Sequence, residues 1–405
     1  MGTESNTPSS EVTSHAAPQP PRRIRLGMVG GGQGAFIGGV HRIAARLDDQ
    51  FEFVAGALSS DPVRAAASAA ELRLPPERSY ANFVDMATQE AARLDGIDAV
   101  AIVTPNHLHA PIATAFLNVG IHIICDKPLC LNTAEAKGLV ELVDQSGCIF
   151  ALTHNYSGYP MVRQAREMVA SGLLGTIRVV QAEYPQDWLS TDLAATGQKQ
   201  AMWRSDPAQS GAGGSLGDVA THAEHLVRYI SGLDLQSVSA DLSCFLEGRK
   251  LDDNAHILLH YTNGARGMLW SSQIAPGSEN ALKVRIYGNK AGIEFSQEHP
   301  NQLWFCPLGQ PRQLLTRGGP GLGAAAAHAS RIPAGHPEGY LEGFAQIYRD
   351  VAEQIHARWQ QRQPNPLSCT VPTVVDGALG MQFIEAAVAS NRADGRWMDA
   401  RLLLI

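Results

Sequence analysis

The sequence lacks the features that would place it among membrane, metal-binding or nucleic-acid-binding proteins. No apolar run approaches the roughly 18 residues that a membrane-spanning helix needs. The net charge is −7 and the pI is near 6.0, so there is no excess of basic residues to attract nucleic acid or acidic lipid. The six cysteines form no CxxC pair and have no Cys/His spacing typical of zinc ligands. We therefore expect no metal, reduced thiols, and a small molecule rather than a nucleic acid or a membrane as the partner.

Large apolar residues are almost absent from residues 1–23, which are rich in Ser, Thr, Pro and Ala. Such a segment cannot bury enough surface to order itself, so we expect a disordered tail. Arg22 and Arg23 precede an apolar stretch, as they do in a twin-arginine export signal. This stretch runs directly into a glycine-rich turn, however, and is better explained as a first β-strand. The expected location is therefore cytoplasmic.

The sequence does contain enough apolar material for two domains, since 44% of its 405 residues are hydrophobic and 18% are charged. From residue 24 to residue 153, short apolar runs alternate with amphipathic stretches. This alternation predicts right-handed crossovers and a doubly wound parallel sheet, the Rossmann type of α/β fold. The expected strands are 24–29, 51–58, 97–103, 121–125 and 148–152, and the expected helices are 40–47, 61–72, 82–94, 109–119 and 133–146.

Beyond residue 153 the pattern changes to longer alternating segments, which predict an α+β domain with a large, mostly antiparallel open sheet. We assign residues 154–370 to this second domain, and residues 371–405 to a C-terminal helix and tail that pack back on the body. The Gly- and Ala-rich stretch 318–334 is expected to be a loop. The expected strands are 177–188, 238–246, 255–261, 267–274, 283–287 and 292–295, and the expected helices are 161–171, 217–231, 338–357 and 374–390.

A glycine-rich turn follows the first expected strand and opens the first helix, which is the context that a dinucleotide-binding turn requires. Gly30 and Gly32 let the backbone turn and approach a pyrophosphate at the helix N-terminus. Gly30, Gly32 and Ala35 fit the G-x-G-x-x-A form, whereas Gly34 and Gly38 suggest a longer loop, so the third small residue stays open. The predicted cofactor-binding residues of this turn are Gly30, Gly32, Gln33, Gly34, Ala35, Phe36 and Ile37.

The end of the second expected strand normally separates NAD from NADP, because a carboxylate there binds the ribose 2′-hydroxyl and repels a 2′-phosphate. Ser59 fills this position, and Asp61 can be explained as the N-cap of the next helix. Arg64 could serve a 2′-phosphate or could simply be a surface arginine. The expected cofactor is NAD, with NADP as the alternative, and Ser59 is expected to contact it.

Polar residues follow two further strands at the carboxyl edge of the expected parallel sheet, where open α/β sheets bind their ligands. A lysine at this edge can polarise a hydroxyl or a carbonyl as a cation. On its own it could equally be a solvated lysine, and the other polar residues could be a capped strand-to-helix junction. The residues predicted to face the cofactor from here are Thr104, Pro105, Asn106, His109, Asp126 and Lys127.

The expected helix 217–231 places Asp218 and His222 four residues apart, and therefore on one face. A histidine near its ordinary pKa of about 6.5 can accept a proton from an alcohol, and a neighbouring carboxylate stabilises the imidazolium that forms. Alternatively, Asp218 only starts the helix and His222 is a buried polar residue. His225 is a competitor, although it lies about 60° away from the face of Asp218.

Four motifs in this order resemble the Gfo/Idh/MocA oxidoreductases: the glycine-rich first strand, the Thr-Pro-Asn-His turn at 104–107, the Lys-Pro at 127–128, and the Asp-x-x-x-His at 218–222. The resemblance runs from residue 24 to the C-terminus, with Asp126 where members more often have Glu. It implies that the lysine, aspartate and histidine form a catalytic trio that also contacts the substrate. It further implies that the sheet of the second domain binds substrate and joins subunits into a homo-oligomer, either a dimer or a tetramer.

Other stretches are similar to the branch of this family that oxidises pyranose sugars, anhydrosugars, inositols and glycosides, among them 184–188, 203–204 and 335–340. On this resemblance we expect Trp203 and Arg204 near the cofactor. Side chains that would suit a polyhydroxylated ring, through hydrogen bonds or an aromatic face, are Tyr156, Gln186, Trp188 and His336. Each of these could instead serve core or interface packing.

We therefore predict an NAD(P)-dependent dehydrogenase that oxidises a secondary hydroxyl of a sugar, anhydrosugar, glycoside or cyclitol to the keto form. In this prediction His222 removes the hydroxyl proton, Lys127 polarises the developing alkoxide, and Asp218 orients and tunes His222, while hydride passes to the nicotinamide. Two alternatives remain. One is an NAD-dependent glycosidase or lyase with transient hydride transfer, and the other is a nucleotide-sensing binding protein without turnover.

Overall fold

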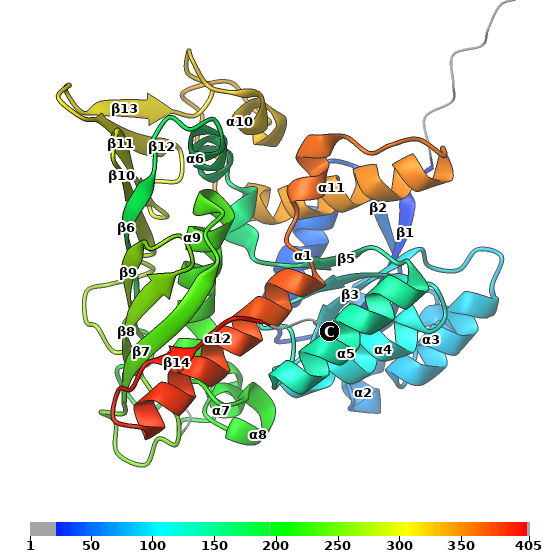
Figure 1. Cartoon of the computed structure of the whole chain (residues 1–405). Helices are drawn as coiled ribbons and strands as arrows, with labels where there is room; N and C mark the ends of the chain where they lie inside the picture. Colours follow the sequence, from blue (N-terminus) through cyan, green and yellow to red (C-terminus); the bar gives the residue numbers. More distant parts are fainter. Residues whose placement is uncertain (1–21, 194, 403–405) are drawn as a thin grey trace, which may run out of the picture.

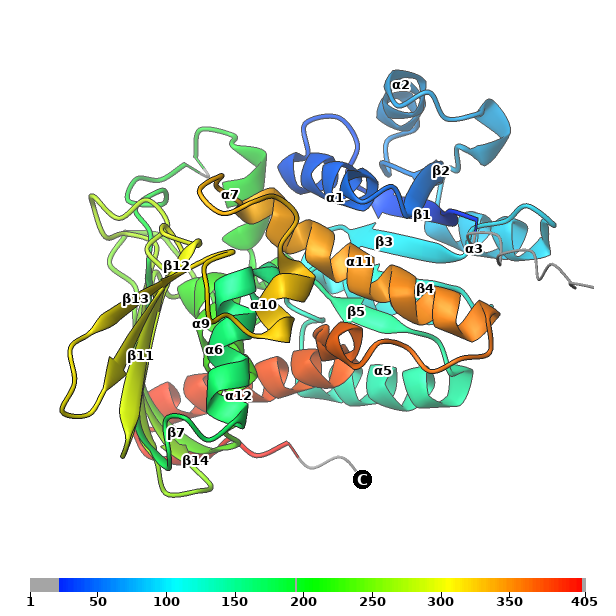
Figure 2. The same ribbon diagram turned by 90° about the horizontal axis from the view of Figure 1, so that it is seen from above.

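The computed structural model describes residues 22–193 and 195–402 and shows two β-sheets beside each other, with helices between and around them (Figures 1 and 2). Of the predicted tail, residues 1–21 lie outside the described residues. Arg22, the first described residue, forms an ion pair of 2.7 Å with Asp98, and its guanidinium lies over the ring of Trp359. Within the described ranges, no helix is both long and apolar enough to cross a membrane.

The first sheet confirms the predicted doubly wound fold, because its five strands are all parallel in the order β2-β1-β3-β4-β5. The order reverses between β1 and β3, which leaves a crevice at the carboxyl ends of these strands. The strands are β1 (Ile24–Gly30), β2 (Phe51–Ala57), β3 (Ala99–Val103), β4 (His122–Cys125) and β5 (Phe150–Leu152). The helices are α1 (Phe36–Leu47), α2 (Pro62–Glu71), α3 (Phe83–Ala92), α4 (His109–Leu117) and α5 (Thr133–Ser146), with short turns η1 (Pro76–Arg78) and η2 (Asn106–Leu108).

The second sheet has nine strands in the order β13-β12-β11-β10-β6-β9-β8-β7-β14, and only the β6–β9 pair is parallel. The prediction of a large, mostly antiparallel sheet is confirmed. The predicted strands missed the hairpin β12–β13 and the two-residue strand β14. The strands are β6 (Ile177–Pro185), β7 (Leu235–Ser243), β8 (Asn254–Tyr261), β9 (Arg266–Ser272), β10 (Lys283–Gly288), β11 (Ala291–Ser296), β12 (Gln302–Pro307), β13 (Gln313–Thr316) and β14 (Met398–Asp399).

In the part of the chain that the structure describes, helices cover one face of the second sheet, the face that looks toward the first sheet (Figure 2). They are α6 (Pro160–Ala170), α9 (Thr221–Ser231) and α12 (Val374–Arg392), and α12 also packs against α5. A five-residue π-helical turn, η4 (Leu216–Ala220), leads into α9 where a continuous α-helix had been predicted. The remaining short elements are η3 (Asn155–Gly158), α7 (Lys199–Arg204), α8 (Pro207–Ser210) and η5 (Pro366–Thr370).

The predicted loop 318–334 contains a short helix, α10 (Ala324–Ala329), so this expectation was wrong in part. Alanine has the highest helix propensity, and the Ala-rich stretch uses it here. Two side chains of α6 also accept hydrogen bonds from backbone groups at the start of α10. Gln164 accepts from Gly323 N at 2.8 Å, and Glu167 accepts from Ala325 N at 2.9 Å.

The long helix α11 (Tyr340–Trp359) returns to the first sheet and packs along α1. His41 Nδ1 lies 2.8 Å from the Tyr348 hydroxyl across this contact, and the His41 ring meets Phe344 edge to face. Farther along α11, Asp350 pairs with the buried Arg163 of α6 at 2.5 Å. The C-terminal part of the chain therefore contacts both sheets, which fixes the carboxyl edge of the first sheet against the helices of the second.

Candidate active site

Several positions in the turn between β1 and α1 can be occupied only by glycine. Gly30 and Gly31 have φ of 80° and 71°, and a Cβ on Gly30 would lie 2.6 Å from the carbonyl oxygen of Val103. A Cβ on Gly38 would lie 2.4 Å from the Cα of Gly31. The small residue that brings α1 against the turn is therefore Gly38. This settles the open choice among Gly34, Ala35 and Gly38.

A cleft of about 560 Å³ runs along the carboxyl ends of β1, β2, β3 and β4. Its shape fits a dinucleotide at a topological switch point. The hydroxyl oxygen of Thr104, which lies in this lining, is buried and has no partner within the protein, as expected of a group that meets a ligand. The predicted cofactor residues in the lining are Gly30, Gly32, Gln33, Ala35, Ile37, Ser59, Thr104, Pro105, Asn106, Asp126, Lys127, Trp203 and Arg204.

Three predicted cofactor residues do not line this cleft. Gly34 and Phe36 line a neighbouring hollow, and Phe36 also lines the second cleft described below. His109 is fully buried, with its ring nitrogens 2.8 Å from the Pro128 carbonyl oxygen and 2.9 Å from the Thr104 carbonyl oxygen. His109 therefore braces the loops after β3 and β4 against each other. His109 had been expected to face the cofactor, but it lies in the first turn of α4, which directs its side chain into the core.

A second cleft, of about 660 Å³, meets the first at Lys127. Ile37, Asp126, Gln200 and Arg204 also line both clefts. The predicted substrate residues that line the second cleft are Lys127, Tyr156, Gln186, Trp188, Asp218 and His222. The structure does not bring His336 into it, because this side chain is exposed on the loop before α11 and its carbonyl accepts a hydrogen bond from Arg317.

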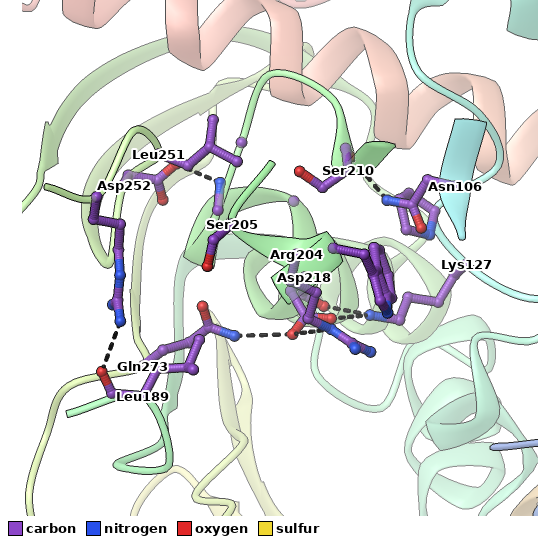
Figure 3. A pocket seen from close by; sticks show the side chains of 16 residues that line it. Asn106, Lys127, Leu189, Arg204, Ser205, Ser210, Asp218, Leu251, Asp252 and Gln273 are labelled. Carbon is purple, nitrogen blue, oxygen red and sulfur yellow. Dashed lines mark hydrogen bonds and ion pairs between the residues drawn. The ribbon is translucent and has the colours of Figure 1, made fainter. Parts of the chain in front are cut away.

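Lys127 is held by Asp218, which comes from η4, far along the chain (Figure 3). Lys127 Nζ donates to Asp218 Oδ1 at 2.8 Å and to the Asp218 carbonyl oxygen at 2.6 Å. The other carboxylate oxygen accepts from Gln273 Nε2 at 2.8 Å and lies 3.3 Å from Arg204 Nε. Burial alone would raise the pKa of the Asp218 carboxyl, but the charges of Lys127 and Arg204 lower it well below its usual range. Asp218 is therefore ionised and fixes the ammonium group in place.

His222 lies one turn after Asp218 and is 8% exposed, among aromatic rings. The ring centroids of Tyr156 and His154 are 4.9 and 5.4 Å from that of His222, and its Nδ1 is buried without a partner. Burial lowers the pKa of His222 well below 6.5, and the nearby Lys127 and His154 lower it further. At neutral pH the imidazole is therefore uncharged and can accept a proton.

Asp218 and His222, which were expected to lie together on one helix face, do not pair in the structure. The structure describes both side chains, and no hydrogen bond or ion pair joins them. The prediction assumed α-helical periodicity, in which residues four apart share a face. The π-helical turn of η4 adds a residue per turn and breaks that periodicity, as often occurs at functional sites. The start of η4 is anchored by Asp252, whose carboxylate accepts from Gly214 N and Leu216 N, both at 2.7 Å.

Three residues of the second cleft and its walls were not predicted. Gln273 follows β9 and donates to Asp218, and its only signal was a polar residue near the end of an expected strand. Asn280 lies in a loop, and its Oδ1 accepts from Tyr184 at 2.7 Å and from Gln186 at 2.6 Å. The Tyr184 hydroxyl in turn lies 2.5 Å from that of Tyr156. Loop residues such as Asn280 show no periodicity, so no sequence pattern could have found this network.

The chain matches two family models, and it is similar to proteins whose activities are known in part. Residues 24–154 match the model described as an oxidoreductase family with an NAD-binding Rossmann fold, and residues 162–294 match the GFO/IDH/MocA C-terminal domain. The crystal structure of an oxidoreductase from Sinorhizobium meliloti is 53% identical, with a TM-score of 0.85 over 93% of this chain and 100% of that one.

Two further relatives carry names that describe what they bind or oxidise. An inositol dehydrogenase homologue from Azotobacter vinelandii, crystallised with NADH and myo-inositol, is 36% identical, with a TM-score of 0.86 over 93% of this chain and 98% of that one. Levoglucosan dehydrogenase from Pseudarthrobacter phenanthrenivorans is 29% identical over 308 residues, which cover 70% of this chain and 76% of that protein.

Proposed function

Because the chain belongs to the Gfo/Idh/MocA family and is an NAD-dependent oxidoreductase, we propose that it oxidises a secondary hydroxyl of a polyhydroxylated ring to a ketone. The substrate class is a sugar, anhydrosugar, glycoside or cyclitol. One observation carries the proposal. A fixed ammonium group, Lys127, and a neutral imidazole, His222, line one cleft at the point where it meets the dinucleotide cleft.

The proposed chemistry divides between these two groups. His222 accepts the proton of the reacting hydroxyl, because burial keeps its imidazole uncharged. Lys127 stabilises the negative charge that develops on the same oxygen. Asp218 forms no hydrogen bond with His222 in the described structure and instead holds the ammonium group of Lys127 through its carboxylate and its carbonyl. NAD, when bound in the glycine-turn cleft, supplies the acceptor for the hydride.

The walls of the second cleft support a substrate rich in hydroxyl groups. Tyr156 and Gln186 offer polar atoms, and both belong to the network around Asn280. Trp188 adds an aromatic surface of the kind that packs against a sugar ring. One relative is named for levoglucosan and another was crystallised with myo-inositol, and both compounds are polyhydroxylated rings of this class.

A panel of cyclitols, hexoses, anhydrosugars and glycosides tests the proposal. Purified protein is mixed with each compound and NAD⁺, and NADH is followed at 340 nm. The expected result is steady NADH formation with at least one free sugar or cyclitol, together with a keto product. Release of an aglycone without accumulated NADH would instead assign a glycosidase or lyase. Cofactor binding without turnover on the whole panel would indicate a sensing protein.

The second sheet also supports a homo-oligomer, as proposed from the family resemblance. No helix of the described residues lies over its outer face (Figure 2), which carries a row of exposed apolar side chains across four neighbouring strands. Val179 pairs with Tyr287, and Met268 pairs with Leu258. A second copy of this chain, packed through this face, would cover the row. Sedimentation velocity should therefore give at least a dimer, and the double charge change Leu258→Glu with Met268→Glu should give a monomer.

A further inference from the structure

The backbone that carries Asp218 is held by one residue from a distant part of the chain, Asp252, which lies just before β8. The carboxylate oxygens of Asp252 accept from Gly214 N and Leu216 N, both at 2.7 Å, and its carbonyl oxygen accepts from Ser215 N at 2.8 Å. Amide groups at the start of a helical turn have no acceptor within that turn. Three successive amides at the start of η4 therefore all find their acceptors on Asp252.

The contact with Asp252 leads directly to the pair of Asp218 and Lys127. The carbonyl oxygen of Gly214 accepts from Asp218 N at 2.9 Å. Hydrogen bonds of 2.6–2.9 Å therefore connect Asp252 with Lys127 through the backbone of η4. The fit is close, because a Cβ on Gly214 would lie 2.1 Å from the carbonyl oxygen of Asp252.

The residue after Asp252 supports Asp218 by a second route. Asp253 is fully buried, and its carbonyl oxygen accepts from Gln273 N at 2.9 Å. The side chain of Gln273 in turn donates to Asp218 Oδ2 at 2.8 Å (Figure 3). Residues 252 and 253 therefore hold both the backbone and the carboxylate of Asp218.

We propose that Asp252 is a positioning residue for the reaction, which holds η4 so that the carboxylate and the carbonyl oxygen of Asp218 both meet the ammonium group of Lys127. The carbonyl contact, 2.6 Å from Lys127 Nζ, depends directly on this support, because a main-chain oxygen moves only when its backbone moves. Asp252 lines neither the coenzyme cleft nor the substrate cleft, so it acts through Asp218. The inference rests on the role proposed above for Lys127.

A labelling experiment tests the positioning without any substrate. Mass spectrometry follows the acetylation of Lys127 by trace acetic anhydride, relative to that of the exposed Lys290, in the wild type and in Asp252→Asn. Asparagine keeps the shape of aspartate, but its amide nitrogen cannot accept from a backbone N–H, so one contact with η4 is lost. Lys127 is then held less firmly, and its relative labelling should rise about three- to tenfold, the size of one hydrogen bond. Unchanged labelling would overturn the proposal.

Turnover measures the consequence for the reaction. Asp252→Asn should lower kcat roughly tenfold and leave NADH affinity within a few-fold of the wild type. In a Lys127→Met background the same substitution should change kcat by less than about twofold, because the group that it positions is already absent. A loss of the same factor in both backgrounds would show a merely structural role and would overturn the proposal. The matched control is Asp234→Asn, an exposed carboxylate outside both clefts, which should change neither labelling nor kcat.

A second variant disturbs the same contact from the opposite side. Gly214→Ala leaves the carboxylate of Asp252 intact but pushes a methyl group against its carbonyl oxygen. Labelling of Lys127 should rise and kcat should fall, as in Asp252→Asn. If one of the two variants does not fold, the other decides, and wild-type labelling and turnover in the folded variant would overturn the proposal.

These outcomes separate the positioning role from the proposed function. If Asp252→Asn exposes Lys127 to the reagent but Lys127→Met turns over like the wild type, the structural link stands and the proposed function fails. If Lys127→Met loses turnover while Asp252→Asn keeps it, the proposed function stands and the role given to Asp252 is wrong.

Discussion

Replacing Lys127 with methionine should lower kcat by roughly a hundred- to a thousandfold, which is the usual loss when one preorganised group that stabilises developing negative charge is removed. Methionine keeps most of the length of the side chain, so the walls of the cleft should stay in place. The ammonium group that Asp218 holds at 2.8 Å is lost, and the alkoxide then forms without a cation beside it. Initial rates with the best substrate of the panel measure the effect.

Two controls keep this prediction specific. NADH binding by Lys127→Met, measured by fluorescence, should stay within a few-fold of the wild type, because the glycine turn holds the coenzyme. Lys290→Met removes an exposed lysine after β10 and should leave kcat unchanged. Wild-type turnover by Lys127→Met, in a protein with an unchanged melting temperature, would show that Lys127 has no part in the reaction.

Replacing His222 with glutamine should lower kcat by roughly a hundred- to ten-thousandfold, the range expected when a general base is removed. Glutamine keeps polar atoms in the cleft but cannot accept the proton at neutral pH. The matched control is His225→Gln. His225 is also buried and stacks on His154 with ring centroids 4.0 Å apart, but it does not line the substrate cleft. Its replacement should change kcat by no more than a few-fold, and a larger loss than that of His222→Gln would make His225 the base.

The pH profile of the wild type gives an independent measure of the same role. Burial lowers the pKa of His222, so its neutral, proton-accepting form persists at a lower pH than that of a free imidazole. Oxidation, measured as kcat/KM, should therefore survive as the pH falls through 6.5 and should decline only as it falls through the lowered pKa. The His222→Gln variant should lose this acidic limb. A wild-type midpoint above 6.5 would contradict the assignment.

Much of the first domain could be predicted because its strands are short, buried and bounded by turn-forming residues. The apolar run before the glycine turn forms β1 one residue longer than expected, and the run 121–125 forms β4 one residue shorter. Helix α1 begins at Phe36, four residues earlier than predicted, because Gly38 had suggested a longer loop. Low helix propensity is overridden there by the close contact between Gly38 and Gly31, which only tertiary packing creates.

The three residues proposed to be catalytic all line one cleft, but their hydrogen-bond partners were not predicted. Lys127 stands at the end of a parallel strand, and that position alone places it at the ligand-binding edge of the sheet. Its partner Asp218 is 91 positions away in the chain, so no periodicity relates the two. Gln273, after a strand of the second sheet, donates to Asp218, and Asn280 reaches the cleft from a loop, and no sequence periodicity relates either residue to its partners.

The sequence by itself determined the two kinds of sheet, the glycine turn and the residue types at the strand ends, because burial and turn chemistry leave patterns that repeat within a few residues. The tertiary structure alone decided that Asp218 holds Lys127 instead of His222, that His109 braces two loops, and that His336 stays outside the cleft. The reason is physical: these contacts depend on how separate segments pack, and an extra residue in one helical turn is enough to change which side chains meet.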